Sequence, residues 1–168
     1  MIYLRNPSYY SGGLDNFEEI ISNIKDVFQD ARGELEDKLG LLEPEEKKRL
    51  NEAMNCYMQK LNYSSIVMSV SAIESRLFSL MMLKEPSAKL ETLSLGGLIT
   101  EYLLNKQRYG NVISSKHLPL LQYCNTYRIL SVHPKKESIQ RANATTILCM
   151  SCSFLFDKEL KTKIEKNK

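Results

Sequence analysis

Apolar residues recur at intervals of three and four along most of the chain, which is the period of an amphipathic α-helix. The first such stretch covers residues 14–40. Asp15 and Glu18 form a helix N-cap pattern at its start, and Gly40 is a typical residue at which a helix stops. The chain is therefore expected to begin with one amphipathic helix.

A second helix is predicted from Pro44, because proline followed by two glutamates suits the first turn of a helix. Its apolar stripe continues until residues 62–63, an Asn-Tyr pair that is expected to break or kink the element. Residues 64–83 are apolar on nearly every side, which is typical of a central helix packed against several neighbours. Pro86 should end this helix.

Three more helices are predicted in the second half of the chain, over about residues 90–107, 116–132 and 138–163. A loop is expected over residues 108–115, and the lysine-rich tail 158–168 is expected to be a solvated helix end that frays. No run alternates cleanly between apolar and polar residues. The sequence therefore predicts an all-α fold, an up-and-down bundle of about five helices in a single domain.

Composition supports a folded helical protein and limits its location. The chain has 168 residues, 43% hydrophobic and 26% charged, with only 7 Gly and 5 Pro, which argues against disorder, collagen and turn-rich β folds. Its net charge of +3 permits an anionic partner without requiring one. The first residues hold no secretory signal pattern, and the nearly apolar stretch 145–156 is too short to span a bilayer. We expect a soluble cytoplasmic protein without a membrane partner.

The four cysteines do not form a disulfide-dense framework, and free buried thiols suit a reducing compartment. Cys149 and Cys152 have the spacing of half a zinc site, but no second Cys or His pair follows at a suitable interval. On a helix the two thiols fall on adjacent core positions, so we interpret them as core residues and expect neither a metal nor a cofactor.

The segment from Arg128 to Pro134 holds the most informative residues. Arg128 and His133 are five residues apart, so on a straight helix they lie about 140° apart in projection. Pro134 disfavours helical geometry for the residue before it, so the helix should end near His133. The imidazole could then turn back toward Arg128 or toward a symmetry-related copy.

Arg128 lies on an otherwise apolar helical stripe, four residues after Cys124. Glu74 interrupts another apolar stripe, four residues after Val70. A guanidinium and a carboxylate that both point into a bundle can pair through bidentate hydrogen bonds. We therefore predict a contact between Arg128 and Glu74.

This arrangement resembles the HEPN superfamily (higher eukaryotes and prokaryotes nucleotide-binding domain), helical bundles marked by an arginine followed after four to six residues by a histidine. Residues 52–83 look like the central helices of that family, and residues 128–134 with the helix that holds Ala142 look like its last two. The likeness covers about residues 45–157. It leaves the first helix as an N-terminal extension and 158–168 as a basic tail.

The resemblance implies a metal-independent endoribonuclease whose site forms at a homodimer interface from both subunits, and a role as a toxin or a stress or defence effector. His133 would be the general acid or base, Arg128 would hold the phosphate, and Glu74 would be a structural partner of the site. Basic residues near the start of the last helix would bind the RNA backbone without reading sequence: Lys135, Lys136 and Arg141.

Two other functions stay open. Many members of the family carry a polar residue, usually Asn, directly after the arginine, where this chain has Ile129. That departure is compatible with a non-catalytic HEPN module that binds nucleotide or a partner protein, such as a cognate antitoxin or regulator. The third hypothesis is a helical dimer with a purely architectural role. The second histidine, His117, is expected to be exposed and inert.

Overall fold

The computed structural model describes residue 39 and residues 42–133 and 138–165, and every regular element in these ranges is a helix. In chain order they are α3 (Pro44–Met58), α4 (Asn62–Lys84), α5 (Leu95–Leu104), α6 (Lys106–Tyr109), α7 (His117–Val132), α8 (Arg141–Leu155) and α9 (Lys158–Glu165). The chain divides into two units, 1–39 and 40–168. The all-α class is confirmed for the described part, whereas the helix predicted over 14–40 lies almost wholly outside it.

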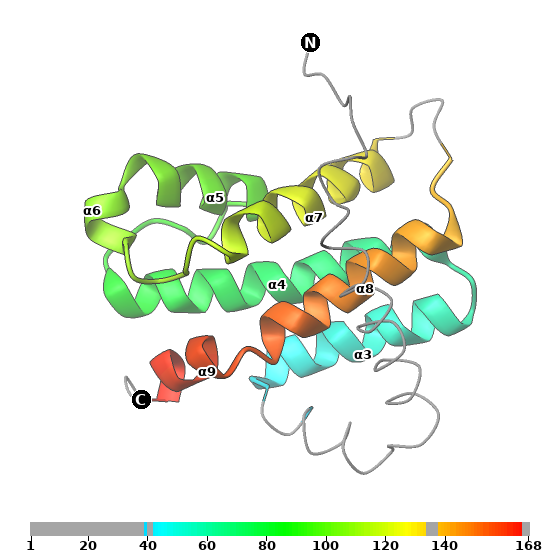
Figure 1. Ribbon diagram of the computed structural model, residues 1–168, viewed down its shortest axis with the longest axis horizontal. Helices are drawn as coiled ribbons and strands as arrows, with labels where there is room; N and C mark the ends of the chain where they lie inside the picture. Colours follow the sequence, from blue (N-terminus) through cyan, green and yellow to red (C-terminus); the bar gives the residue numbers. More distant parts are fainter. Residues whose placement is uncertain (1–38, 40–41, 134–137, 166–168) are drawn as a thin grey trace. The chain divides into compact units, whose positions relative to one another are not determined.

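Helix α4 is the centre of the second unit, as its nearly uniform apolar surface predicts. It contacts α3, α5, α6, α7, α8 and α9 (Figure 1). The long helices α3, α7 and α8 pack along it, and the short helices α5, α6 and α9 gather around the end where α4 finishes. The bundle therefore consists of long helices with a cluster of short ones at one end.

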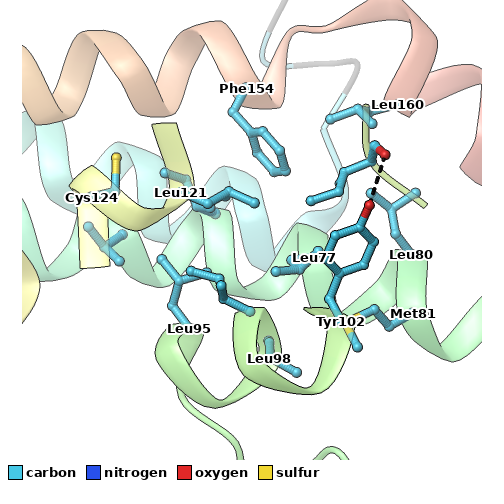
Figure 2. Packing of buried hydrophobic residues seen from close by; sticks show 14 of the residues in the cluster. Leu77, Leu80, Met81, Leu95, Leu98, Tyr102, Leu121, Cys124, Phe154 and Leu160 are labelled. Carbon is cyan, nitrogen blue, oxygen red and sulfur yellow. Dashed lines mark hydrogen bonds between the residues drawn. The ribbon is translucent and has the colours of Figure 1, made fainter. Parts of the chain in front are cut away.

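The hydrophobic core is drawn from most of these helices rather than from one pair. Figure 2 shows side chains of α4, α5, α7, α8 and α9 packed together. Its buried members include Leu77, Met81, Leu95, Leu98, Leu121, Phe154 and Leu160. Because α9 contributes Leu160 to this shared core, α9 is part of the folded bundle.

The turn between α3 and α4 falls just before the predicted break at residues 62–63. Lys60 has a φ of 63°, the left-handed conformation that usually requires glycine. The Leu61 N–H donates to the Cys56 carbonyl at 2.9 Å and the Lys60 N–H donates to the Tyr57 carbonyl at 3.0 Å. This pair of bonds is a Schellman motif, which satisfies the last carbonyls of α3.

The helix predicted over 90–107 is shorter and divided. Residues before Ser94 form turns, and Leu90 is buried without being helical. Helix α5 begins at Leu95, whose N–H donates to the Glu74 carboxylate at 2.6 Å. A carboxylate at a helix N-terminus is stabilised by the free N–H groups there, so a residue of α4 fixes where α5 starts.

The helix predicted over 138–163 is also divided, at Asp157. Asp157 Oδ1 accepts hydrogen bonds from the backbone N–H groups of Glu159 at 2.9 Å and Leu160 at 3.3 Å, so this carboxylate caps α9. The prediction of a frayed, solvated tail is wrong for α9, because Leu160 and Ile164 are 0% and 5% exposed. Their spacing of four residues gives α9 an apolar face that packs into the core.

Candidate functional site

His133 stands at the end of α7, as the proline after it predicts. Helix α7 finishes at Val132, and His133 is its C-terminal cap residue with φ −116° and ψ 89°. Its backbone N–H still donates to the Ile129 carbonyl at 3.0 Å, whereas its side chain is exposed. The imidazole is therefore accessible from solvent at the end of a long helix.

Arg128 lies within α7 and is half-buried, beside a stripe whose members Leu121 and Cys124 are fully buried. Within the described ranges the Arg128 side chain makes no hydrogen bond or ion pair. The five-residue spacing on α7 projects Arg128 and His133 about 140° apart. Helix α7 ends before His133, however, and no hydrogen bond joins the two side chains.

The predicted ion pair between Arg128 and Glu74 is wrong. Glu74 is half-buried on α4, and its Oε2 accepts the Leu95 N–H at the start of α5. No hydrogen bond or salt bridge connects it with Arg128 in the part of the chain that the structure describes. Glu74 thus fixes the start of α5 instead of orienting Arg128.

The buried arginine of α4 is Arg76, to which the sequence pattern had assigned no role. Arg76 and Glu46 are 1% and 0% exposed, and two hydrogen bonds join them: Arg76 Nε to Glu46 Oε1 at 2.7 Å and Arg76 Nη2 to Glu46 Oε2 at 2.6 Å. Glu46 Oε2 also accepts the Glu43 N–H at 3.0 Å in a capping box of α3. The signal was present, because Arg76 lies three residues after Ile73 and four before Leu80.

Arg141, the first residue of α8, is exposed but held in place by α3. Its guanidinium lies 4.1 Å from the centre of the Tyr57 ring, and its Nη1 donates to the Tyr57 carbonyl at 3.1 Å. Such stacking of a cation on an aromatic face restricts the side chain without neutralising it. Lys135 and Lys136 lie outside the described residues.

His117 is neither exposed nor isolated, so the prediction for it is wrong. It is 4% exposed at the start of α7, with its ring edge-on to Phe154 at 5.4 Å between centroids. Its Nδ1 lies 3.2 Å from the backbone nitrogen of Ser114, and its Nε2 lies 3.2 Å from Asp157 Oδ2. Because a backbone N–H can only donate, Nδ1 is the acceptor and Nε2 the donor.

Asp157 therefore connects the starts of two helices through one carboxylate. Oδ1 caps α9, while Oδ2 is 2.9 Å from Lys116 Nζ and 3.2 Å from His117 Nε2. Burial opposes ionisation of this carboxyl, but hydrogen bonds from Lys116, His117 and the α9 backbone outweigh burial and lower its pKa to about 2. Asp157 is thus a charged junction between α7 and α9.

We expect Asp157→Asn to lower the free energy of unfolding by about 1–2 kcal/mol at neutral pH, because asparagine keeps the capping oxygen and loses the charge. Since the folded pKa is below the usual 3.8, the charge stabilises the fold above 3.8, and that contribution fades as pH falls toward about 2. Urea unfolding of both proteins across this range measures it. A difference that stays constant below 3.8 would contradict the assignment.

The four cysteines lie in the core as predicted, all buried and unpaired. Burial raises the pKa of Cys124 and Cys152 to about 12 and that of Cys149 to about 11, so these thiols stay protonated. No group of three or more His, Cys, Asp or Glu side chains in the described ranges could hold a metal ion. Cys149 and Cys152 are therefore packing residues.

Comparisons with protein-family models, curated proteins and solved structures found no match for this chain. By length and composition alone, α4 could cross a membrane, and half of its apolar window is buried inside the fold. Its central position among the other helices and the buried ion pair of Arg76 are features of a core helix. The candidate site consequently rests on the chain's own residues at the end of α7.

Proposed function

We propose that this protein is a HEPN-like, metal-independent endoribonuclease of the cytoplasm that acts as a homodimer. One observation carries the proposal: α7 ends in an exposed imidazole at His133, five residues after a half-buried arginine that has no ion-pair partner among the described residues. The sequence resemblance to the HEPN superfamily assigns catalysis to this arginine and histidine. A toxin or defence role, with a cognate antitoxin or regulator, is part of the same proposal.

The HEPN resemblance implies a site formed by two copies, and within one copy no hydrogen bond joins Arg128 to His133. The end of α7 also exposes two apolar side chains, Ile129 at 42% and Val132 at 46%. Exposed apolar residues on one surface favour association with a partner. If two copies meet through this end of α7, the arginine of one can face the histidine of the other.

The proposed reaction is transfer of an RNA phosphodiester to the neighbouring 2′-oxygen. His133 of one copy removes the 2′-hydroxyl proton as the 2′-oxygen attacks phosphorus, and His133 of the other gives a proton to the leaving 5′-oxygen. Arg128 stabilises the extra negative charge on the phosphoryl oxygens in the transition state. The products are a 2′,3′-cyclic phosphate and a 5′-hydroxyl. Arg141, Lys135 and Lys136 would bind flanking phosphates.

The test is cleavage of a labelled single-stranded RNA in the presence of a chelator. We expect His133→Ala to slow cleavage by about a hundredfold or more, because a general acid or base contributes factors of that size. Arg128→Ala should cause a comparable loss. Arg108→Ala is the matched control, since Arg108 is a half-exposed arginine whose ion pair with Glu85 is remote in sequence from α7's end. Light scattering on the same samples gives the oligomeric state.

Two results would reject the nuclease: cleavage that is unchanged in His133→Ala, or cleavage that requires a divalent metal. A specific observation favours one alternative, a non-catalytic module that binds a partner protein. Ile129 is an exposed apolar residue where many family members have a polar one. A protein that dimerises or binds RNA normally but does not cleave it would support that alternative.

A further inference from the structure

A cavity of about 670 Å³ lies at the other end of α7 from His133. It is open to solvent on one side and is lined by the end of α5, by α6, by the loop that precedes α7, by the first turn of α7 and by α9. Sixteen residues separate His117 from His133, which is about 24 Å along the axis of α7. The cavity is therefore a separate place from the proposed nuclease site.

The loop that forms one wall is held at several points. Tyr102 Oη donates to the Ile113 carbonyl at 3.4 Å (Figure 2), and His117 accepts the Ser114 N–H. From α9, Lys163 Nζ donates to the Asn111 carbonyl at 2.8 Å. Ile113 itself is 3% exposed. Irregular backbone fixed in this way loses little freedom when a ligand binds.

The lining combines positive charge, hydroxyl groups and an apolar surface. Lys106 and Lys163 provide two ammonium groups, and Glu159, which pairs with Lys163 at 3.1 Å, provides one carboxylate. The side chains that line the cavity therefore carry a net charge of +1. Ser114 and Ser115 add hydroxyl donors to the lining. Ile113, Leu118 and the Tyr102 ring add apolar surface.

We propose that this cavity binds a small phosphorylated molecule that also carries an apolar or aromatic portion. The ammonium of Lys106 and the serine hydroxyls are suitable donors to phosphate oxygens. The Tyr102 ring and Leu118 are suitable surfaces for a sugar or base. The volume is within the range of small-molecule sites, which is about 300–1,000 Å³. Binding at this site is a function separate from RNA cleavage.

The test is isothermal titration of the full chain with AMP and with pyrophosphate. We expect AMP to bind more tightly than pyrophosphate, because only AMP also covers the apolar surface. Lys106→Ala should weaken AMP binding by about tenfold, the size expected for one hydrogen bond to a charged group. Ser115→Ala should weaken it less. Lys48→Ala, which removes an exposed lysine of α3, is the matched control and should leave binding unchanged.

The proposal is overturned if neither probe binds at millimolar concentration, or if Lys106→Ala binds AMP as well as the wild type. It is also overturned if Arg128→Ala abolishes AMP binding, because the probe would then occupy the other end of α7. Loss of RNA cleavage in His133→Ala with unchanged AMP binding would support both sites. AMP binding by a protein that never cleaves RNA would support this site alone.

Discussion

Replacing Glu46 with glutamine is expected to lower the free energy of unfolding by about 3–5 kcal/mol, because the change leaves the Arg76 guanidinium buried without a counter-charge. Both side chains are at most 1% exposed, and two short hydrogen bonds join them. Since small proteins are stable by only about 5–15 kcal/mol, the loss is a large part of the total. Urea unfolding followed by circular dichroism measures it.

The matched control is Glu45→Gln, one residue earlier on the same helix. Glu45 pairs with Arg49 at 2.8 Å, but its side chain is 53% exposed, so we expect a much smaller loss than for Glu46→Gln. The double variant Glu46→Met with Arg76→Met removes both buried charges together. It should be more stable than Glu46→Gln, because a buried ion pair contributes little beyond an apolar pair of similar volume. Equal losses in Glu45→Gln and Glu46→Gln would contradict the assignment.

Apolar periodicity was sufficient to predict the class of fold and its central element. The helix expected over residues 64–83 is α4, and the stop expected before Pro86 falls at Lys84. The end of α7 at His133 also followed from one local rule, the restriction that a proline places on the residue before it. These predictions depend only on residues close together in the chain.

The buried ion pair was misassigned because α4 is apolar on nearly every side. On such a helix the stripe that contains Glu74 and the stripe that contains Arg76 have the same apolar pattern. The apolar periodicity therefore does not indicate which stripe faces α3 and which faces α5. Glu74 faces the start of α5, and Arg76 faces Glu46 of α3. Deciding which of the two residues forms the buried ion pair requires knowing how the neighbouring helices pack against α4.

The environment of His117 could not be predicted from the sequence for a different reason. Its partner Asp157 is 40 residues away in the chain, and no local pattern joins them. The geometry of the candidate nuclease site is even harder to predict from the sequence, because it depends on a second copy of the chain. The sequence predicts that α7 ends at His133, but a facing arginine from a second copy depends on how two chains associate, which no spacing within one chain specifies.

Leu160→Ala is expected to lower the free energy of unfolding by about 2–5 kcal/mol, although the lysine-rich sequence around it predicts a frayed tail. Leu160 is fully buried in the shared core, and its N–H is held by Asp157. Removing its side chain leaves a cavity between α9 and α4, which are in contact. Urea unfolding measures the change, with Lys158→Ala on the exposed side of α9 as the control. A loss below about 0.5 kcal/mol for Leu160→Ala would mean that α9 unfolds independently, and Lys163 would then not be fixed in the lining of the proposed binding cavity.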